Sequence, residues 1–412
     1  MYYLAGVSRY HSYLNSTVTI LFLYKGDEPF PLFVKRYFSG NKKFGSTDRK
    51  QISHLCYCYF RLGKALPAMP VEERIITALF LCSDEPNKIL EELKPEWNQK
   101  TSLSARDKIS FLHLTDLSNK IFPWNEELSV GIDKEEFSLS YLQQPDLFLR
   151  IRPGHAEDVL LKINAIEIEY EFISPFTLRL PNSFKADQHF ELDKEVVVQD
   201  YNSQQVIFFL QNFKPHPAEG GTGNKFSLWD CCAASGGKSI MAKDILGDID
   251  LTVSDVRESI LLNLKKRFSI AGINKYQSLV LDLTKENFQN TIKSNPRLTD
   301  SVGQEYSMII ADVPCTGSGT WGRTPEQLYY FEDRKIEEYA SLQKQIVTNV
   351  ISHLAPGGYF LYITCSVFKK ENEEAIDFIK DKFQLQLVKM ELLKGYDKKA
   401  DTMFAALLKK PL

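Results

Sequence analysis

A regular alternation of short apolar runs and amphipathic segments fills the second half of the chain and limits the possible folds more than any other feature. Each run reads as a buried strand, and each is followed by a turn and a segment with helical spacing. This order is typical of a mostly parallel sheet that helices cover on both faces. The expected strands lie at residues 226–229, 251–254, 278–281, 308–311, 359–363, 384–393 and 403–408. We therefore predict an α/β domain over residues 196–412.

The first 130 residues show a different pattern. Their apolar positions recur mostly at helical spacing, as at Ile52 and Leu55, and prolines separate the segments. We predict an all-helical domain over residues 1–130, in which residues 46–49 offer N-cap candidates for the helix that holds residues 54–60.

A compact α+β segment is expected between these two domains, over residues 137–195. Residues 147–152 and 166–172 read as strands, and the second run alternates with period two. A short helix is predicted at residues 156–163. The segment would form a small platform leading into the α/β domain.

The composition is that of an ordinary globular protein, with 43% hydrophobic and 25% charged residues in a chain of 412. This length allows two or three domains. No apolar run approaches the roughly 18–20 residues that a membrane span needs, and the first residues do not look like a signal peptide. Seven cysteines without framework spacing indicate free thiols in a reducing compartment. We predict a cytoplasmic protein with no membrane partner.

Charge is distributed unevenly, although the net charge is only −3. Residues 35–64 hold eight basic residues and the single acid Asp48, a local balance of 8 − 1 = +7. Two interpretations stay open: a solvated helical face, or a surface that docks on RNA phosphates without reading sequence. The aromatic residues between these charges are expected in the helical core and not as base-stacking groups. The eight basic residues are Lys35, Arg36, Lys42, Lys43, Arg49, Lys50, Arg61 and Lys64.

Small residues and paired glycines follow the first strand of the α/β domain, between Trp229 and Ser239. Such a turn lets the backbone approach a ligand closely at the N-terminus of the next helix. It is not a phosphate-binding P-loop, because Cys232 stands where that motif has its first glycine. An acid at the end of a single strand is often only a helix cap. Acids at the ends of three consecutive strands instead favour a nucleoside cofactor, because an acid about twenty residues past the glycines can bind the ribose hydroxyls. These acids are Asp255, Asp282 and Asp312.

Two cysteines fifty residues apart, Cys315 and Cys365, each follow a hydrophobic strand of this sheet. Both thiols are therefore expected at one sheet edge, beside the cofactor turn. Methylation of a pyrimidine C5 needs a thiolate that adds to C6, and then a base that removes the C5 proton so that the thiolate can leave. A carboxylic acid such as Asp312 would neutralise charge that develops in the ring. The cysteines expected as inert packing are Cys56, Cys58, Cys82 and Cys231.

With these motifs the sequence resembles the RsmB-like, Sun-type RNA 5-methylcytosine methyltransferases. The resemblance rests on the runs Asp230 to Lys238, Asp312 to Gly319 and Thr364 to Ser366, and it covers at least residues 147–410. Residues 44–61 also resemble the NusB-like RNA-binding domain of that family. The chain departs from the pattern at Ser235, where the family usually has proline, so that the turn loses a fixed φ.

The resemblance implies a Rossmann-like class I S-adenosylmethionine-dependent methyltransferase domain, with an antiparallel pairing among its last strands, preceded by an all-helical NusB-like domain. It also implies that Cys365 attacks C6, that Cys315 assists elimination and product release, and that Asp312 contacts the cytosine near the methyl donor. No metal ion is implied. The residues implied to bind S-adenosylmethionine are Cys232, Ala233, Ala234, Ser235, Gly236, Gly237, Lys238, Asp255, Asp282 and Asp312.

For this chain the resemblance implies a monomer that methylates cytosine C5 in 16S ribosomal RNA. Methylation of tRNA is chemically indistinguishable at this level, and a non-catalytic ribosome-assembly factor that kept the fold is a further alternative. A DNA cytosine methyltransferase is less favoured, because those enzymes use the Pro-Cys cysteine as nucleophile and do not need the Thr-Cys-Ser thiol. The target cytosine has to be unstacked to reach a thiol, which favours a loop or an incompletely assembled particle as substrate.

Overall fold

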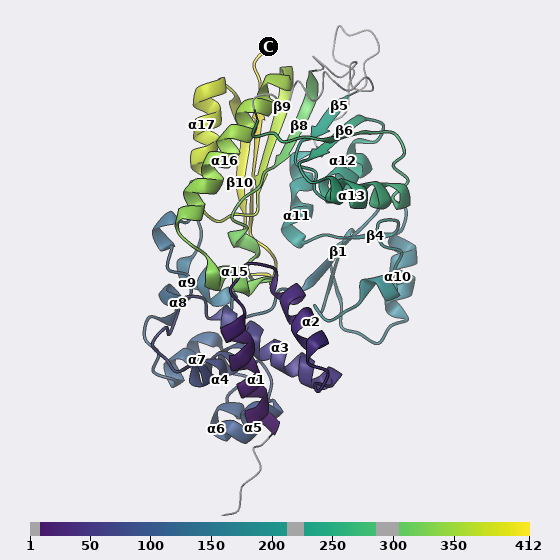
Figure 1. Ribbon diagram of the computed structural model, residues 1–412. Helices are drawn as coiled ribbons and strands as arrows, with labels where there is room; N and C mark the ends of the chain where they lie inside the picture. Colours follow the sequence, from purple (N-terminus) through teal and green to yellow (C-terminus); the bar gives the residue numbers. More distant parts are fainter. Residues whose placement is uncertain (1–8, 212–225, 286–304) are drawn as a thin grey trace, which may run out of the picture. The chain divides into compact units, whose positions relative to one another are not determined.

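The computed structural model describes residues 9–211, 226–285 and 305–412 (Figure 1). The chain divides into two compact units. In the part described, no helix is long and apolar enough to cross a membrane. The expected division at residues 1–130, 137–195 and 196–412 stays a prediction. Unit 1 comprises Met1–Leu128, Ile132–Gln144 and Thr320–Glu332, and unit 2 comprises Ser129–Gly131, Pro145–Gly319 and Asp333–Leu412.

Unit 1 consists of helices joined by turns, as the spacing of its apolar residues predicts. Aromatic rings form much of its core, with ring centroids 5.1 Å apart for Phe30 and Phe60 and 4.6 Å apart for Trp321 and Phe331. Its helices are α1 (Arg9–Leu23), α2 (Phe30–Gly40), α3 (Ser46–Arg61), α4 (Val71–Cys82), α5 (Lys88–Leu93), α6 (Pro95–Asn98), α7 (Ala105–Phe111), α8 (Leu117–Ile121), η1 (Asn125–Glu127), α9 (Lys134–Ser140) and α15 (Pro325–Tyr330).

Helix α3 begins at the predicted place but with a different cap. The N-cap is Gly45, which has no capping side chain, and its backbone N–H donates to Asp48 Oδ2 at 2.9 Å. Arg9 and Tyr13 also bond to Asp48, at 2.7 and 2.6 Å, and together these donors lower the pKa of Asp48 to about 2. The carboxylate thus joins α1 to the start of α3.

The basic stretch of residues 35–64 divides into a buried and an exposed part. Arg61 is buried and donates to Tyr141 O at 2.8 Å, and Lys64 donates to Tyr329 O at 2.7 Å. For these two residues the expectation of a solvated or RNA-docking face is wrong, because their charges bind backbone carbonyls inside unit 1. The basic residues that lie exposed without an acidic partner in the described residues are Lys35, Lys42, Lys43, Arg49 and Lys50. The expected aromatic core is confirmed for Phe38, Phe44, Tyr59 and Phe60.

Unit 2 contains a seven-stranded sheet with the order β10-β11-β9-β8-β5-β6-β7. The strands from β9 to β7 pair in parallel, whereas β11 is antiparallel to both of its neighbours. The expected Rossmann-like fold and its late antiparallel pairing are therefore confirmed. The strands are β5 (Ser227–Asp230), β6 (Asp250–Asp255), β7 (Gln277–Val280), β8 (Tyr306–Asp312), β9 (Leu354–Thr364), β10 (Gln386–Leu393) and β11 (Met403–Lys409).

Alternate residues of these strands supply two separate cores, one on each face of the sheet. Helices α12 (Gly237–Leu246) and α13 (Glu258–Ile270) cover one face, and α16 (Arg334–Val350) and α17 (Glu373–Phe383) cover the other (Figure 1). In β8, for example, Ile310 packs towards α12 and Ile309 towards α16. The amphipathic segment expected after residues 278–281 lies outside the described residues. The shorter helices are α11 (Tyr201–Gln205), η3 (Val206–Phe209), η5 (Ser318–Thr320) and η6 (Ile351–His353).

A second, four-stranded sheet in unit 2 has the order β2-β3-β1-β4 and packs on α10 (Ala156–Asn164). The strand predicted at residues 166–172 is wrong over most of its length, because β2 begins only at Glu171. Residues 166–170 instead form the bend that follows α10, where Ile166 N–H donates to Ile163 O at 3.1 Å. The elements are β1 (Leu147–Ile151), β2 (Glu171–Ser174), β3 (Thr177–Leu180), η2 (Ala186–Gln188) and β4 (Val196–Val198).

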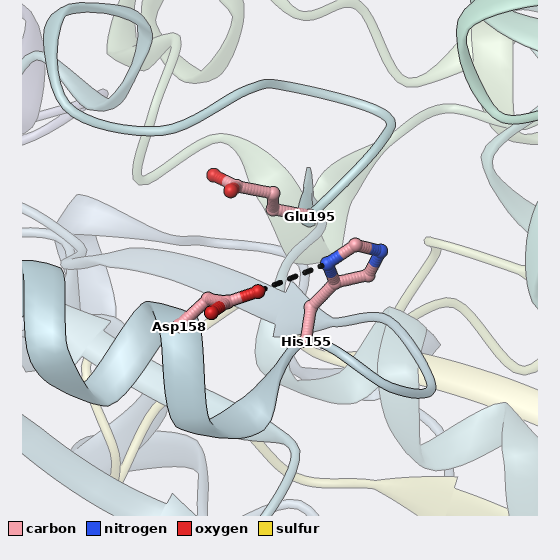
Figure 2. Close-up of side chains that lie close together, drawn as sticks. All are labelled: His155, Asp158 and Glu195. Atoms are coloured by element: carbon pink, nitrogen blue, oxygen red, sulfur yellow. Dashed lines mark ion pairs between the residues drawn. The ribbon is translucent and has the colours of Figure 1, made fainter.

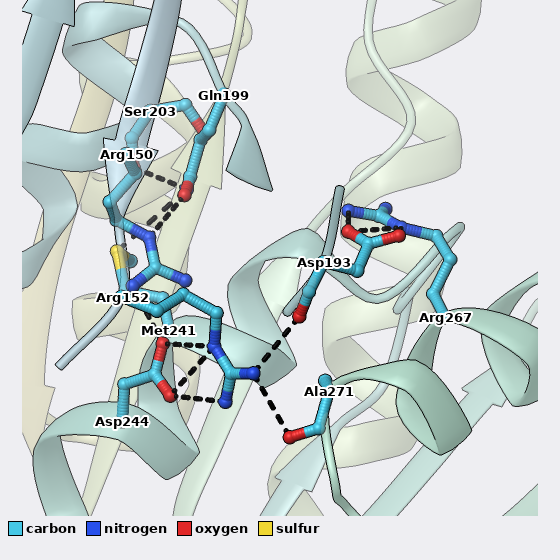
Figure 3. Close-up of polar contacts among 9 residues, drawn as sticks. All are labelled: Arg150, Arg152, Asp193, Gln199, Ser203, Met241, Asp244, Arg267 and Ala271. Carbon is cyan, nitrogen blue, oxygen red and sulfur yellow. Dashed lines mark hydrogen bonds and ion pairs between the residues drawn. The ribbon is translucent and has the colours of Figure 1, made fainter. Parts of the chain in front are cut away.

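Buried arginines tie this small sheet to the seven-stranded one (Figure 3). Arg150 of β1 and Arg152, just after it, both bind Asp244 of α12, at 2.7 and 2.8 Å. Arg152 also donates to Ala271 O at 3.0 Å, just beyond α13. The small sheet is thereby fixed to the two helices that cover one face of the large sheet.

Candidate active site

The turn after β5 has the backbone conformation that close approach to a ligand requires. Gly236 has a φ of +84°, and a Cβ there would lie 2.6 Å from Phe268 Cε1. Ala234 also has a positive φ of +47°, and its N–H donates to Asp255 Oδ2 at 3.1 Å. At Gly237, the first residue of α12, an added Cβ would meet no described atom within 4 Å. There is therefore open space beside the first residue of α12, where a ligand could approach the helix N-terminus.

Ser235 stands where the family that this sequence resembles has proline, and hydrogen bonds from an arginine hold it in place. Arg267 Nη1 donates to Ser235 O at 2.9 Å and to Ser235 Oγ at 2.8 Å. The same guanidinium binds Asp193 at 2.7 Å, as Figure 3 shows. Both charged side chains are largely buried. The fixed φ that proline would supply is thus replaced by two hydrogen bonds from α13.

Two of the predicted cofactor acids lie at the ends of neighbouring strands. Asp255 is the last residue of β6 and binds the Arg257 guanidinium at 3.0 Å. Asp282 lies two residues beyond the end of β7, where it accepts hydrogen bonds from Thr284 Oγ1 and N–H at 2.6 and 3.1 Å, which lower its pKa. Both carboxylates therefore stand at the carboxyl edge of the sheet, and their contacts with a cofactor stay predictions.

The two predicted thiols meet at the same edge. β8 and β9 are adjacent and parallel, with Asp312 opposite Ile363. Cys315 lies three residues past the end of β8, and Cys365 directly follows β9. The Sγ atoms lie 3.2 Å apart, as free thiols in hydrogen-bond contact. The hydrogen bond with Cys365 and burial raise the pKa of the Cys315 thiol well above its usual range. A Cys315 thiol with this raised pKa keeps its proton at neutral pH.

Gly319 closes the loop after Cys315 against the loop after Cys365. Its N–H donates to Cys365 O at 2.9 Å, and its carbonyl accepts from Thr402 N–H at 3.0 Å. A Cβ at this position would lie 1.9 Å from Thr402 O. Only glycine permits so close an approach of three backbone segments.

Asp312 and Lys238 form an ion pair between the thiols and the cofactor turn. Lys238 Nζ donates to Asp312 Oδ2 at 2.5 Å. Burial alone would lower the pKa of Lys238, but the Asp312 carboxylate outweighs it, and the net shift is upward. Lys238 therefore keeps its charge, and it orients Asp312 from the turn that the sequence predicts to bind the cofactor.

Asp230, the first residue of the family motif, lies inside the protein beneath the turn and not in the open site. Its Oδ2 accepts from Ser239 Oγ at 2.6 Å, and burial raises its pKa to about 7. Cys231 is also buried, in the core on the α16 face, as expected of inert packing. In the turn itself, Cys232 and Ser235 are half-buried and Ala233 is buried.

Sequence reasoning missed a group of buried polar residues behind the thiols. Glu371 and Asn372 are both fully buried, and Glu371 accepts from Thr316 N–H at 2.9 Å. The sequence could not predict their burial, because they lie in a polar run, residues 369–374, whose composition is typical of an exposed helix start.

Among the described residues, one group offers three potential metal ligands: His155, Asp158 and Glu195, with ligand atoms within 4.8 Å of one another (Figure 2). It lies in the small-sheet region, on and beside α10. Lys162 Nζ binds both Glu195 oxygens, at 2.6 and 2.7 Å. Because an ammonium group already neutralises this carboxylate, the arrangement does not favour a divalent ion.

Comparison with known proteins shows what the second half of the chain is similar to. Residues 220–408 match the family model described as 16S rRNA methyltransferase RsmB/F. The chain is 28% identical over 242 residues to the ribosomal RNA small subunit methyltransferase B of Erwinia tasmaniensis, covering 57% of this chain and 51% of that protein. The protein of the same name from Cronobacter sakazakii is 29% identical over 309 residues, covering 70% and 62%. The chain spans about half the length of the first of these curated relatives.

Solved structures show the same fold. The crystal structure of PH0851 covers 97% of this chain and 98% of its own, with a TM-score of 0.65 and 19% identity. A methyltransferase homologue from Pyrococcus horikoshii covers 69% and 92%, with a TM-score of 0.53 and 19% identity. At this identity the likeness concerns the fold alone.

Proposed function

We propose, from the match of residues 220–408 to the model of the 16S rRNA methyltransferase RsmB/F family, that the protein methylates cytosine C5 in small-subunit ribosomal RNA. The observation that carries the proposal is the pair of thiols, 3.2 Å apart at the ends of two neighbouring parallel strands. Methylation at a pyrimidine carbon uses two such groups, because one must add to the ring and the addition must later be reversed.

S-adenosylmethionine is the cofactor, and it supplies an electrophilic methyl group when bound. The residues at the sheet edge fit it: a turn with free space beside Gly237, and carboxylates at Asp255 and Asp282 that can accept hydrogen bonds from hydroxyl and amino groups. Asp255 would hold the ribose, once Arg257 has moved from its oxygens. The Lys238–Asp312 pair stands between this turn and the thiols.

In the proposed reaction the Cys365 thiolate adds to C6 and forms an S–C6 bond, which makes C5 nucleophilic. After C5 has gained the methyl group, a base takes the C5 proton, and the S–C6 bond breaks to restore the aromatic ring and the thiolate. Cys315 assists this elimination. The distance between the sulfur atoms supports these roles, because a protonated Cys315 thiol 3.2 Å away can donate a hydrogen bond that stabilises a thiolate at Cys365.

Trapping on RNA tests the role of each thiol. RNA containing 5-fluorocytidine lacks the C5 proton, so the wild-type enzyme should form a stable covalent adduct. Cys365→Ala should form none. Cys315→Ala should accumulate an adduct even on unmodified RNA, because elimination is impaired. The assignment fails if Cys365→Ala still forms the adduct and Cys315→Ala does not, or if both variants behave alike.

The choice of ribosomal RNA rests on the relatives named ribosomal RNA small subunit methyltransferase B. Bisulfite sequencing of total RNA from a deletion strain identifies the methylated RNA directly. Loss of a single 5-methylcytosine from 16S RNA is the expected result. Loss from a tRNA would instead assign the same chemistry to the other substrate.

A further inference from the structure

Glu371 and Asn372 are two buried polar residues that connect the cysteine loops. Both side chains are fully buried in front of α17, although neighbouring Glu374 is exposed. A carboxyl group and an amide cost free energy in such a place unless they find hydrogen-bond partners. The partners of both residues are the neighbours of the two cysteines.

Glu371 holds the loop that carries Cys315. Its Oε2 accepts from Thr316 N–H at 2.9 Å and from Gln343 Nε2 at 3.3 Å. Gln343 Nε2 also donates to Pro314 O, at 3.0 Å. The residues on both sides of Cys315 are thus tied to one carboxyl group, directly or through one amide.

Asn372 holds the loop that carries Cys365 in the same manner. Its Oδ1 accepts from Thr364 Oγ1 at 2.5 Å, and its Nδ2 donates to Ser366 O at 2.9 Å. Nδ2 also donates to Ser129 Oγ at 2.8 Å, which fixes the orientation of the amide. The residues on both sides of Cys365 therefore depend on Asn372.

Hydroxyl groups join the two loops directly. Thr316 Oγ1, Ser318 Oγ and Ser366 Oγ lie 3.2 Å from one another, and Tyr362 OH donates to Glu371 O at 2.7 Å. Burial raises the pKa of Glu371 to about 7. A buried carboxyl group whose charge is disfavoured by its surroundings contributes little to the stability of the fold. Such groups are typical of functional positions.

We propose that Glu371 and Asn372 are positioning residues that set the separation and orientation of the Cys315 and Cys365 thiols. Because the two residues are consecutive, a single peptide unit connects the hydrogen bonds of the Cys315 loop to those of the Cys365 loop. A displacement of one loop therefore displaces the other. The inference rests on the proposed function only for its effect on methyl transfer. Its effect on the thiols themselves can be measured without RNA or S-adenosylmethionine.

The first test is the alkylation of the two thiols by iodoacetamide in the full-length protein, followed by mass spectrometry of the peptides that contain Cys315 and Cys365. Glu371→Gln removes the charge and one of the two acceptor oxygens of the side chain that binds Thr316 and Gln343, and Asn372→Ala removes both bonds to the Cys365 loop. In each variant the ratio of the two alkylation rates should change several-fold. Glu374→Gln, the exposed charge-matched control, should leave it unchanged. An unchanged ratio in the correctly folded variants overturns the proposal.

The second test separates positioning from a general loss of structure. Methyl transfer to RNA should show a kcat lowered by roughly 10- to 100-fold, the effect expected for reacting groups displaced by a fraction of an ångström to one ångström. The KM for RNA and the affinity for S-adenosylmethionine should hardly change, because neither residue lies in the cofactor turn. A normal kcat in both folded variants, or an equal change in KM and kcat, overturns the positioning role.

Gln343→Met keeps the proposal testable if the other variants do not fold. It preserves the Glu371 carboxyl group and removes the amide that ties it to Pro314 and that accepts from Tyr362 OH at 3.0 Å. The ratio of alkylation rates should shift in the same direction as in Glu371→Gln, by less. No shift in this variant overturns the proposal. If the wild-type protein does not methylate RNA although the thiol ratio responds, the positioning role is supported and the proposed function fails.

Discussion

At the residue scale, the site depends on glycines and buried acids, and the atoms packed around each of them decide what a substitution would do. Gly319 shows this most directly, because its replacement can be judged from one distance. Gly319→Ala would place a Cβ 1.9 Å from Thr402 O, so the backbone must move. We expect a loss of about 1–3 kcal/mol in the free energy of unfolding, or more, measured by urea titration. Trapping on 5-fluorocytidine RNA should weaken too, since the Gly319 N–H bonds to Cys365 O.

Gly40→Ala is the matched control for that change. Gly40 ends α2, and an added Cβ there would meet no described atom within 4 Å. Helix propensity favours alanine over glycine by up to about 1 kcal/mol, so stability should not fall. Equal losses in the two variants would contradict the role of close packing at Gly319.

Asp230 should make stability depend on pH. Its folded-state pKa, about 7, lies above the value of about 3.9 for an exposed aspartate. Between these values the unfolded chain releases a proton that the folded protein keeps, so the contribution of Asp230 to stability is complete below about pH 4 and is lost as the pH rises to about 7. Asp230→Asn removes this ionisation. The variant should lose less stability than the wild type between pH 4 and pH 7 in urea titrations.

A residual slope is expected in Asp230→Asn, because burial also raises the pKa of Glu371 to about 7. The double variant with Glu371→Gln should have a flatter profile than either single variant. Identical pH profiles for the wild type and Asp230→Asn would show that Asp230 is ionised, or exposed, in the folded protein.

At the element scale, period-two and helical patterns located the strands of the large sheet to within a few residues. The exceptions have physical causes. β9 begins at Leu354 and not near Tyr359, because Pro356, Gly357 and Gly358 form an irregularity inside the strand, where the pairing with β8 shifts register. A Pro-Gly-Gly run reads as a turn in any sequence, so only the pairing with β8 reveals the strand.

The attachment of the small sheet to α12 rests on Asp244, which binds both Arg150 and Arg152. The side chains of Arg150 and Asp244 are only 6% and 7% exposed. Asp244→Ala would leave two buried guanidinium groups without their carboxylate, so unfolding should become easier by about 3–5 kcal/mol. Thermal unfolding and urea titration measure this change.

An exposed ion pair provides the comparison for Asp244. Glu338 binds Arg334 at 2.9 Å on the surface of α16, with both side chains more than half exposed. Glu338→Ala should cost less than about 1 kcal/mol. If Asp244→Ala is equally mild, the buried network does not hold the small sheet in place.

At the scale of the whole molecule, sequence patterns predicted the fold class and the edge at which the site residues gather. Strand ends and glycine turns can be recognised from a few neighbouring residues. The sequence alone was therefore enough to locate four residues at that edge: Cys315, Cys365, Asp312 and Asp255. The hydrogen bonds behind them could not be predicted, because Glu371 finds its partners only through the long-range pairing of β8 with β9. The burial of Arg61 could not be predicted for the same reason, because the carbonyl groups that it binds, those of Tyr141 and Gln143, lie 80 and 82 residues away in the chain.

The exposed basic residues of unit 1 lead to the last prediction, which decides between a solvated face and an RNA-docking surface. Five of them, all in α2, α3 and the loop between them, can be replaced together by glutamine: Lys35, Lys42, Lys43, Arg49 and Lys50. If they bind phosphates, RNA affinity should fall to a similar degree for every sequence. The slope of log K against log salt should also shrink, by about 0.7 for each phosphate of single-stranded RNA that is no longer neutralised.

The control replaces five exposed lysines of unit 2 by glutamine, which changes the net charge equally: Lys185, Lys194, Lys382, Lys389 and Lys398. Binding is measured by fluorescence anisotropy at several salt concentrations. A solvated face predicts that both variants lose the same small amount of affinity, through net charge alone. A docking surface predicts a markedly larger loss, and a flatter salt dependence, only in the unit 1 variant. Because these residues lie outside the thiol site, single-turnover methylation at saturating RNA should keep its rate in that variant, so that docking and chemistry are read separately.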